Sequence, residues 1–274
     1  MSTASAVVAR TLGRYQRDLR MDRLVVAGGI AGLGLGTLLF WQFGLTYLVN
    51  IRYTSTPADV GRSLVALVET GTLLKNVQVT MTEAVSGYLI GIAVGLGGAL
   101  LLLMTRRGYD VLEPYLLAFY SIPKIALAPL FIMWFGLGPT PKVLLAALMV
   151  FFIVFMNTVA GVRAVDRRLV EVIRVLGASR LQIMGKVLVP AAAPAIVAAI
   201  RVTFARAMVG AVLAEMIAST EGLGHMLVRS ARQFDIATLF AGIAVIAVLV
   251  MSVNVAVSAV ERRLFPWTSH AVHG

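Results

Sequence analysis

The sequence predicts an all-α integral membrane protein with six transmembrane helices. Of its 274 residues, 59% are hydrophobic and 14% are charged, whereas about 25% of the residues are charged in an average soluble domain. The mean hydropathy of +0.89 leaves no room for a large soluble domain. The charged residues gather between long apolar stretches, and a spanning helix needs about 20 mostly apolar residues.

Six stretches are long enough to be transmembrane helices. Four of them are uncharged: residues 24–51, 84–105, 143–162 and 236–260. Two more, residues 111–137 and 190–216, are interrupted by proline or by charged residues. These two cross a bilayer if their ionisable groups face protein or water instead of lipid. The first stretch is too long for a cleavable signal peptide, so we expect a retained helix.

Lysine and arginine in the short loops predict the orientation of these helices. Most of the 24 basic residues fall in the N-terminal segment, in the loops after the second and fourth spans, and near the C-terminus. Both termini are therefore predicted to be cytoplasmic, and the formal net charge of +11 reflects topology rather than nucleic-acid binding. We expect a cytoplasmic segment at residues 1–23, a six-helix transmembrane domain at 24–264 and a cytoplasmic tail at 265–274.

Two of the predicted spans carry glycine at every fourth residue. The glycines are Gly28, Gly32 and Gly36 in the first span, and Gly87, Gly91 and Gly95 in the second. Such a stripe lets a neighbouring backbone approach closely, whereas a phosphate-binding glycine loop would need a preceding strand. Between these two spans, residues 60–69 are amphipathic and predict a short helix at the membrane surface.

The loop between the fourth and fifth spans, residues 163–189, predicts two short helices that form an elbow. Its first helix has an apolar stripe of Leu169, Ile173 and Leu176, spaced for one helix face. Gly177 is expected to end that helix in the left-handed conformation. Ser179 and Gln182 have the spacing of a capping box that begins the second helix, and Pro190 marks where that helix meets the membrane.

An exposed apolar stripe on this elbow predicts a partner, since uncovered apolar surface costs roughly 25 cal/mol per Å². The alternative is a surface helix that rests on lipid headgroups. In that case Glu171 would be paired with Arg167 or Arg174 on its own helix.

The elbow resembles the cytoplasmic loop of permeases from bacterial ATP-binding-cassette importers. That loop has the form Glu-Ala-Ala, three residues, Gly, nine residues, Ile-x-Leu-Pro. At this spacing the chain has Glu171, Gly177 and Pro190, with Val187 and Val189 at the two aliphatic positions. Val172 and Ile173 replace the alanine pair, which alters the helix face but keeps it apolar.

The resemblance extends over most of the chain, roughly residues 57–265, and is nearest to the branch that imports nitrate, sulfonates, taurine and related compounds. Its signatures here are SIPKIALAPL at 121–130, WFGLG at 134–138, NTVAGVR at 157–163, EMIAS at 215–219 and EGLG at 221–224. The same branch also imports neutral or cationic vitamin precursors, so the resemblance leaves the cargo open.

The resemblance implies a type I importer permease fold in the bacterial inner membrane and favours a homodimer around a central pathway. Each elbow would seat in a groove on a cytoplasmic ATPase subunit, and an extracytoplasmic binding protein would deliver the solute. The implied coupling residues are Glu171, Ile173, Leu176, Gly177, Ala178 and Pro190. The chain itself would be no enzyme and bind no cofactor, because ATP and Mg²⁺ would be used by the ATPase.

Ionisable residues at membrane depth are functional candidates by default. Five are predicted as pathway residues: Lys124, Arg201, Arg206, Glu83 and Glu215. Lys124 lies about 12 residues into its span, which is about 18 Å and near the midplane. The three cations could attract an anion such as a sulfonate or nitrate. Alternatively, they pair with the two glutamates or with carbonyl groups freed near Pro123 and only hold helices together.

Two other classes of function, an ion-coupled secondary transporter and a membrane-embedded enzyme, have less support in the sequence. An ion-coupled secondary transporter usually shows repeated halves with matched broken helices, and the sequence has no such symmetry. A membrane-embedded enzyme needs clustered nucleophiles or metal ligands, but the chain has no cysteine and only three histidines.

Overall fold

The computed structural model describes residues 25–26, 28–30, 32–44, 53–105 and 108–264. It divides into two compact units, Met1–Ser63 and Leu64–Gly274. In the first unit the described residues before 40 are helical and lead into a π-helical turn, Phe40–Gly44. Trp41 Nε1 donates a hydrogen bond of 2.8 Å to the Ser55 carbonyl. Helix α3 (Pro57–Glu69) follows and confirms the short helix predicted at 60–69.

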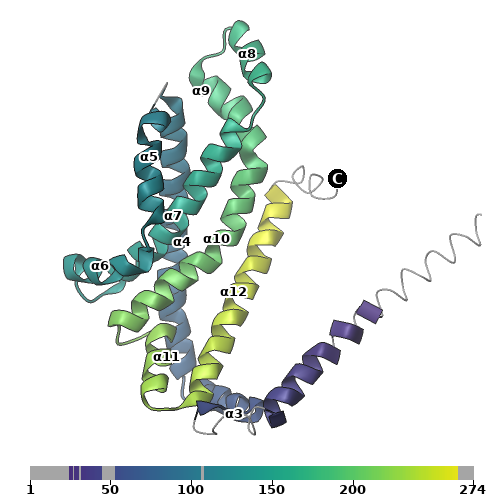
Figure 1. The fold of residues 1–274 in the computed structure, drawn as a ribbon, viewed down its shortest axis with the longest axis vertical. Coiled ribbons are helices and arrows are strands. Elements are labelled where there is room, and N and C mark those ends of the chain that lie inside the picture. Colours follow the sequence, from purple (N-terminus) through teal and green to yellow (C-terminus); the bar gives the residue numbers. More distant parts are fainter. Residues whose placement is uncertain (1–24, 27, 31, 45–52, 106–107, 265–274) are drawn as a thin grey trace, which may run out of the picture. The chain divides into compact units, whose positions relative to one another are not determined.

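The second unit is a bundle of helices without a strand in the part of the chain that the structure describes (Figure 1). Its elements are α4 (Thr72–Met104), α5 (Gly108–Ser121), a 3-10 helix (Lys124–Leu127), α6 (Ala128–Phe135), α7 (Pro139–Arg163), α8 (Arg167–Val175), α9 (Arg180–Ile183), a π-helical turn (Met184–Leu188), α10 (Val189–Ala218), α11 (Leu223–Arg232) and α12 (Ile236–Leu264). The elbow of α8 and α9 lies at one end of this bundle and α11 at the other.

Four of these helices are long and apolar enough to cross a membrane. They are Thr72–Met104, Pro139–Arg163, Arg180–Ala218 and Ile236–Glu261. They confirm the spans predicted at 84–105, 143–162, 190–216 and 236–260. The predicted first span, 24–51, includes positions outside the described residues, so the expected total of six rests partly on them.

The stretch predicted as an interrupted span, 111–137, forms a sharply bent pair of helices. The axis of Gly108–Ser121 and that of Lys124–Phe135 differ by 84°. Pro123 explains the break, because proline lacks an N–H and disfavours helical backbone in the residue before it. A straight helix over this stretch is therefore excluded, and the pair forms either a broken span or a re-entrant loop.

The core of the bundle is formed by α4, α7 and α10, where the glycine stripe of α4 meets α7. A Cβ atom placed on Gly91 would lie 2.6 Å from the Ala147 carbonyl oxygen and 2.6 Å from Val150 Cβ. Gly87 and Gly95 face α7 in the same way. The close approach predicted for this stripe is confirmed. At the corresponding stripe of the first span, no described atom lies within 4 Å of such a Cβ, so that prediction remains untested.

Gly91→Ala is expected to lower the free energy of unfolding by about 1–3 kcal/mol, the usual cost of overpacking a core. The added methyl group would press on the backbone of α7, because the Ala147 carbonyl oxygen would lie 2.6 Å from it. Gly97→Ala on the same helix is the matched control, because no atom that the structure describes lies within 4 Å of its Cβ position. Thermal unfolding in detergent would measure both variants. Equal stability of the two would contradict the close α4–α7 contact.

Candidate functional site

The elbow begins with a helix whose two ends are fixed by local contacts. At its start, Asp166 Oδ1 accepts a hydrogen bond of 2.9 Å from the Arg168 backbone N–H. At its end, Gly177 has φ +85°, the left-handed region that favours glycine. The Ala178 N–H then donates to the Ile173 carbonyl at 3.2 Å. The predicted glycine end of this helix is confirmed.

The second helix of the elbow begins with the predicted capping box. Gln182 N–H donates to Ser179 Oγ at 3.3 Å, and Ser179 N–H donates to Gln182 Oε1 at 2.8 Å. This arrangement satisfies backbone donors that would otherwise lack partners at a helix start. Both caps were predictable because they depend only on residues a few positions apart.

The second helix does not end at the membrane, because Arg180–Ala218 forms one helix of 39 residues, about 58 Å long at 1.5 Å per residue. Pro190 would clash with the Lys186 carbonyl group in a regular α-helix. The π-helical turn Met184–Leu188 lies where that clash would occur and widens the helix there. The elbow is therefore continuous with the membrane-spanning α10.

Helix α8 exposes an apolar surface that no described residue covers. Four side chains are more than half exposed: Leu169 (53%), Val172 (60%), Val175 (87%) and Leu176 (79%). Ile173, predicted in the same stripe, is half-buried, so the exposed stripe runs through Val172 instead. The Glu171 side chain forms no ion pair or hydrogen bond among the described residues. The pairing with Arg167 or Arg174 that the headgroup alternative requires is therefore not observed within them.

The three predicted pathway cations lie apart from the two predicted glutamates. Lys124 Nζ donates to the Tyr120 carbonyl group and lies 4.2 Å from the centre of the Tyr120 ring. It thus uses a carbonyl freed near Pro123, as the structural alternative anticipated. Arg201 is 55% exposed and lies 4.0 Å from Glu261 Oε2. Arg206 is exposed on the same helix.

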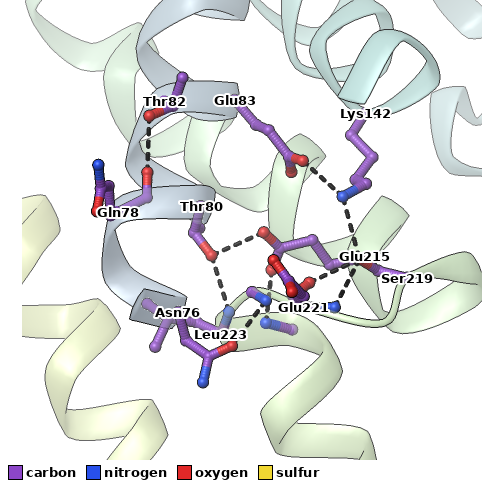
Figure 2. Close-up of polar contacts among 12 residues, drawn as sticks. Asn76, Gln78, Thr80, Thr82, Glu83, Lys142, Glu215, Ser219, Glu221 and Leu223 are labelled. Atoms are coloured by element: carbon purple, nitrogen blue, oxygen red, sulfur yellow. Dashed lines mark hydrogen bonds and ion pairs between the residues drawn. The ribbon is translucent and has the colours of Figure 1, made fainter. Parts of the chain in front are cut away.

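Glu83 instead forms a buried ion pair with Lys142 (Figure 2). Lys142 Nζ lies 2.5 Å from Glu83 Oε1, and the two side chains are 9% and 4% exposed. The same ammonium group donates to Ser219 Oγ at 3.0 Å. This pair connects α4, α7 and the segment that follows α10.

Glu215 organises the loop between α10 and α11. Its Oε1 accepts from Thr80 Oγ1 at 2.7 Å, and its Oε2 accepts from the Gly224 N–H at 2.6 Å. Thr80 Oγ1 in turn accepts from the Leu223 N–H at 2.8 Å. Gly222 has φ +104°, and a Cβ there would collide with the Glu215 carboxylate. The EGLG segment at 221–224 therefore packs against the Glu215 carboxylate, which leaves no space for a side chain at position 222.

An exposed ion pair completes the cluster at the surface of the bundle. Lys75 Nζ lies 2.5 Å from Glu221 Oε1, and its hydrogen bond and charge hold the pKa of Glu221 below the ordinary value. Ser219 Oγ donates to the Glu221 carbonyl at 2.6 Å. Asn76 Oδ1 accepts from the Gly222 N–H at 2.8 Å. We call this network around Glu83, Lys142 and Glu215 the outer cluster. It connects α4, α7, α10 and α11 to the loop at residues 219–222.

The sequence did not single out Thr80 and Lys142 for the outer cluster. A signal was present, since Thr80 shares a helix face with Ala84, Gly87 and Gly91, and Lys142 lies four residues before Ala146. Both therefore lie on the faces that pack together in the α4–α7 contact.

Comparison with known proteins identifies the family to which this bundle of helices belongs. Residues 87–268 match the family model of binding-protein-dependent transport system inner membrane components. The putative aliphatic sulfonates transport permease protein SsuC of Bacillus subtilis strain 168 is 36% identical over 244 residues, covering 88% of each chain. The taurine transport system permease protein TauC of Escherichia coli K12 is 34% identical over 251 residues, covering 86% of this chain and 89% of that one.

The fold also matches a solved structure, described as inward-facing conformations of the MetNI methionine ABC transporter. The TM-score is 0.62 at 21% sequence identity, covering 70% of this chain and 95% of that one. An inner-membrane component of this kind works with a separate ATPase subunit and a binding protein, so ATP hydrolysis belongs to a partner chain. The chain therefore belongs to the family of binding-protein-dependent transport system inner membrane components and is a multi-pass permease subunit of a bacterial ABC importer, not an enzyme.

Proposed function

We propose that this chain forms, with a second identical copy, the membrane pathway for a small organic anion of the sulfonate type. In this proposal residues 24–264 are the transmembrane domain, residues 1–23 and 265–274 are cytoplasmic, and the elbow 163–189 docks on the ATPase. The observation that carries the proposal is the uncovered apolar surface of α8, which needs a partner in the assembled transporter.

The elbow is suited to transmit movement as well as to dock. Glu171, Ile173, Leu176, Gly177 and Ala178 shape its docking side in this proposal, and Pro190 lies where it joins α10. Because α9 and α10 form one helix of 39 residues, a tilt imposed on the elbow is carried to Glu215 near its far end. The outer cluster would then hold the outer ends of α4, α7 and α10 while the ATPase moves their inner ends.

The cargo assignment rests on the cations and on the relatives. Lys124, Arg201 and Arg206 would favour an anion in the pathway because they place positive charge at membrane depth. Two of the similar permeases are described as transporting aliphatic sulfonates and taurine, and both solutes carry a sulfonate group. Glu83 and Glu215 are buried in the outer cluster, so we assign them to positioning the outer end of the pathway.

Leu176→Asp is expected to weaken association with the ATPase about 30- to 100-fold, because burying a leucine contributes about 2–3 kcal/mol. The measurement is binding of the purified ATPase to the full chain in nanodiscs. Glu171→Ala is measured in the same way. Phe234→Asp is the control, because Phe234 is an exposed apolar residue in the turn between α11 and α12. Unchanged ATPase binding by Leu176→Asp would contradict docking through α8.

Lys124→Gln and Arg201→Gln, made singly, are each expected to slow uptake of an aliphatic sulfonate about fivefold, since one charge at close range contributes about 1 kcal/mol in water. The assay is ATP-driven uptake into proteoliposomes that contain the ATPase and the binding protein. Arg229→Gln on α11 is the control. Unchanged sulfonate uptake by both variants, or equal slowing of a neutral vitamin, would contradict an anion-selective pathway.

A further inference from the structure

A crevice separates the elbow from the ends of the neighbouring spans. It consists of two adjoining cavities of about 580 Å³ and 700 Å³ that share the side chains of Val170, Arg174 and Leu188. We call it the elbow crevice. Its lining comes from α8, α9 and the π-helical turn on one side, and from the ends of α4 and α7 and the start of α5 on the other.

The lining of the elbow crevice is apolar on one part and cationic on another. The apolar part consists of Leu103, Met104, Val162, Ile183 and Met184, and the cationic part of Arg163, Arg167, Arg174 and Arg180. Arg163 is already paired with Asp110 and lies 4.2 Å from the centre of the Tyr109 ring. The other three arginines form no ion pair with any residue that the structure describes. Glu171 also lines the crevice, so four arginines face the two carboxylates of Asp110 and Glu171, and the lining keeps a net positive charge.

The elbow crevice lies at the level where three spans end. Met104 is the last residue of α4, Arg163 is the last residue of α7, and Leu188 directly precedes α10. At the end of a spanning helix the hydrocarbon region gives way to the lipid headgroups. Apolar residues there contact acyl chains, and arginine side chains reach the phosphate groups.

From this combination we infer that the elbow crevice binds an anionic phospholipid. Its phosphate group would contact Arg174 and Arg180, and an acyl chain would lie along the apolar lining. Guanidinium groups bind phosphate through paired, charge-assisted hydrogen bonds. A free phosphate ion would use the cations but would leave hundreds of Å³ of partly apolar cavity unfilled.

The lipid site and the proposed ATPase contact share only Glu171 and Ala178, which line the crevice. Val170 and Arg174 line the crevice, whereas Leu169, Val172 and Leu176 are the exposed apolar residues of α8. At 100° per residue these two sets lie on opposite faces of α8. A bound lipid would hold the crevice-facing side of α8 against the membrane, while its exposed apolar side contacts the ATPase.

The test compares phosphatidylglycerol and phosphatidylcholine binding to the purified full chain, titrated in detergent and read by native mass spectrometry. The double variant Arg174→Gln/Arg180→Gln is expected to bind phosphatidylglycerol about 30-fold more weakly than wild type, or about 2 kcal/mol at 1.4 kcal/mol per tenfold. Phosphatidylcholine binding should be weak in both. Arg229→Gln/Arg232→Gln on α11, at the other end of the bundle, should bind like wild type.

Two further measurements distinguish failure of the lipid proposal from failure of the ATPase proposal. Leu176→Asp should lose ATPase binding and keep phosphatidylglycerol binding. A thermal unfolding scan of the double variant Arg174→Gln/Arg180→Gln should show a folded protein. Wild-type phosphatidylglycerol affinity in the double variant would overturn the lipid site. Displacement of the lipid by millimolar inorganic phosphate would overturn the lipid assignment in favour of a free anion.

Discussion

Lys142→Met is expected to lower the free energy of unfolding by about 3–5 kcal/mol, the usual result of removing one partner from a buried ion pair. The variant would leave the Glu83 carboxylate, whose side chain is 4% exposed, without its countercharge. Ser219 would also lose a hydrogen bond from the same ammonium group. Denaturant unfolding of the purified chain in detergent measures the change.

The double variant Glu83→Gln/Lys142→Met separates the charge from the packing. It removes both charges and is expected to recover part of the stability, because no buried carboxylate is left without a countercharge. Lys75→Met is the surface control, because the Lys75–Glu221 pair is largely exposed and such pairs contribute little. If the single and double variants unfolded alike, the loss would come from the missing Lys142 contacts and not from an unpaired Glu83 charge.

The difference between these two ion pairs shows what the sequence could predict. Apolar stretches predicted the spans because each is a local property of the chain, and the start of α12 at Ile236 was placed to the residue. The caps at Gly177 and Ser179 were predicted for the same reason. Lys142, by contrast, looked like a lysine at a helix end, and only the packing of α7 against α4 shows that it is buried against Glu83.

Two prolines, Pro123 and Pro190, alter the helical backbone where they occur. Pro123 interrupts a stretch long enough to span a membrane, but the size of the resulting bend, 84°, depends on what the two halves pack against. Pro190 is predicted to mark where the second helix of the elbow meets the membrane, and the helix continues through this position because a π-helical turn accommodates the proline. The sequence marks where the backbone must adapt, and the tertiary contacts decide whether it turns or continues.

The continuity of α9 with α10 makes the direction of the elbow important for transport. Gly177 sets that direction, because its left-handed backbone joins α8 to the start of this helix. Among the described residues, no atom lies within 4 Å of a Cβ at Gly177. A side chain there would therefore act only through backbone strain and would not create a steric clash.

Gly177→Val is expected to reduce ATPase coupling about 5- to 30-fold, because a β-branched residue in the left-handed region costs about 1–2 kcal/mol. Relief of that strain would turn α8 away from the direction in which it presents its apolar surface. The measurement is ATPase activity that depends on the binding protein and cargo, in nanodiscs that contain the complete transporter.

Two further variants distinguish backbone strain at Gly177 from a general effect of altering the elbow. Gly177→Asn should keep more coupling than Gly177→Val, since asparagine tolerates the left-handed conformation better. Gly185 lies in the same elbow, its φ is not positive, and no atom of the described part of the chain lies within 4 Å of its Cβ position. Gly185→Val should therefore couple better than Gly177→Val. The order Gly185→Val, Gly177→Asn, Gly177→Val from most to least coupled would tie ATPase coupling to the backbone turn at Gly177. Equal coupling in all three would show that the ATPase does not require this turn, and the elbow would then act through its apolar side chains alone.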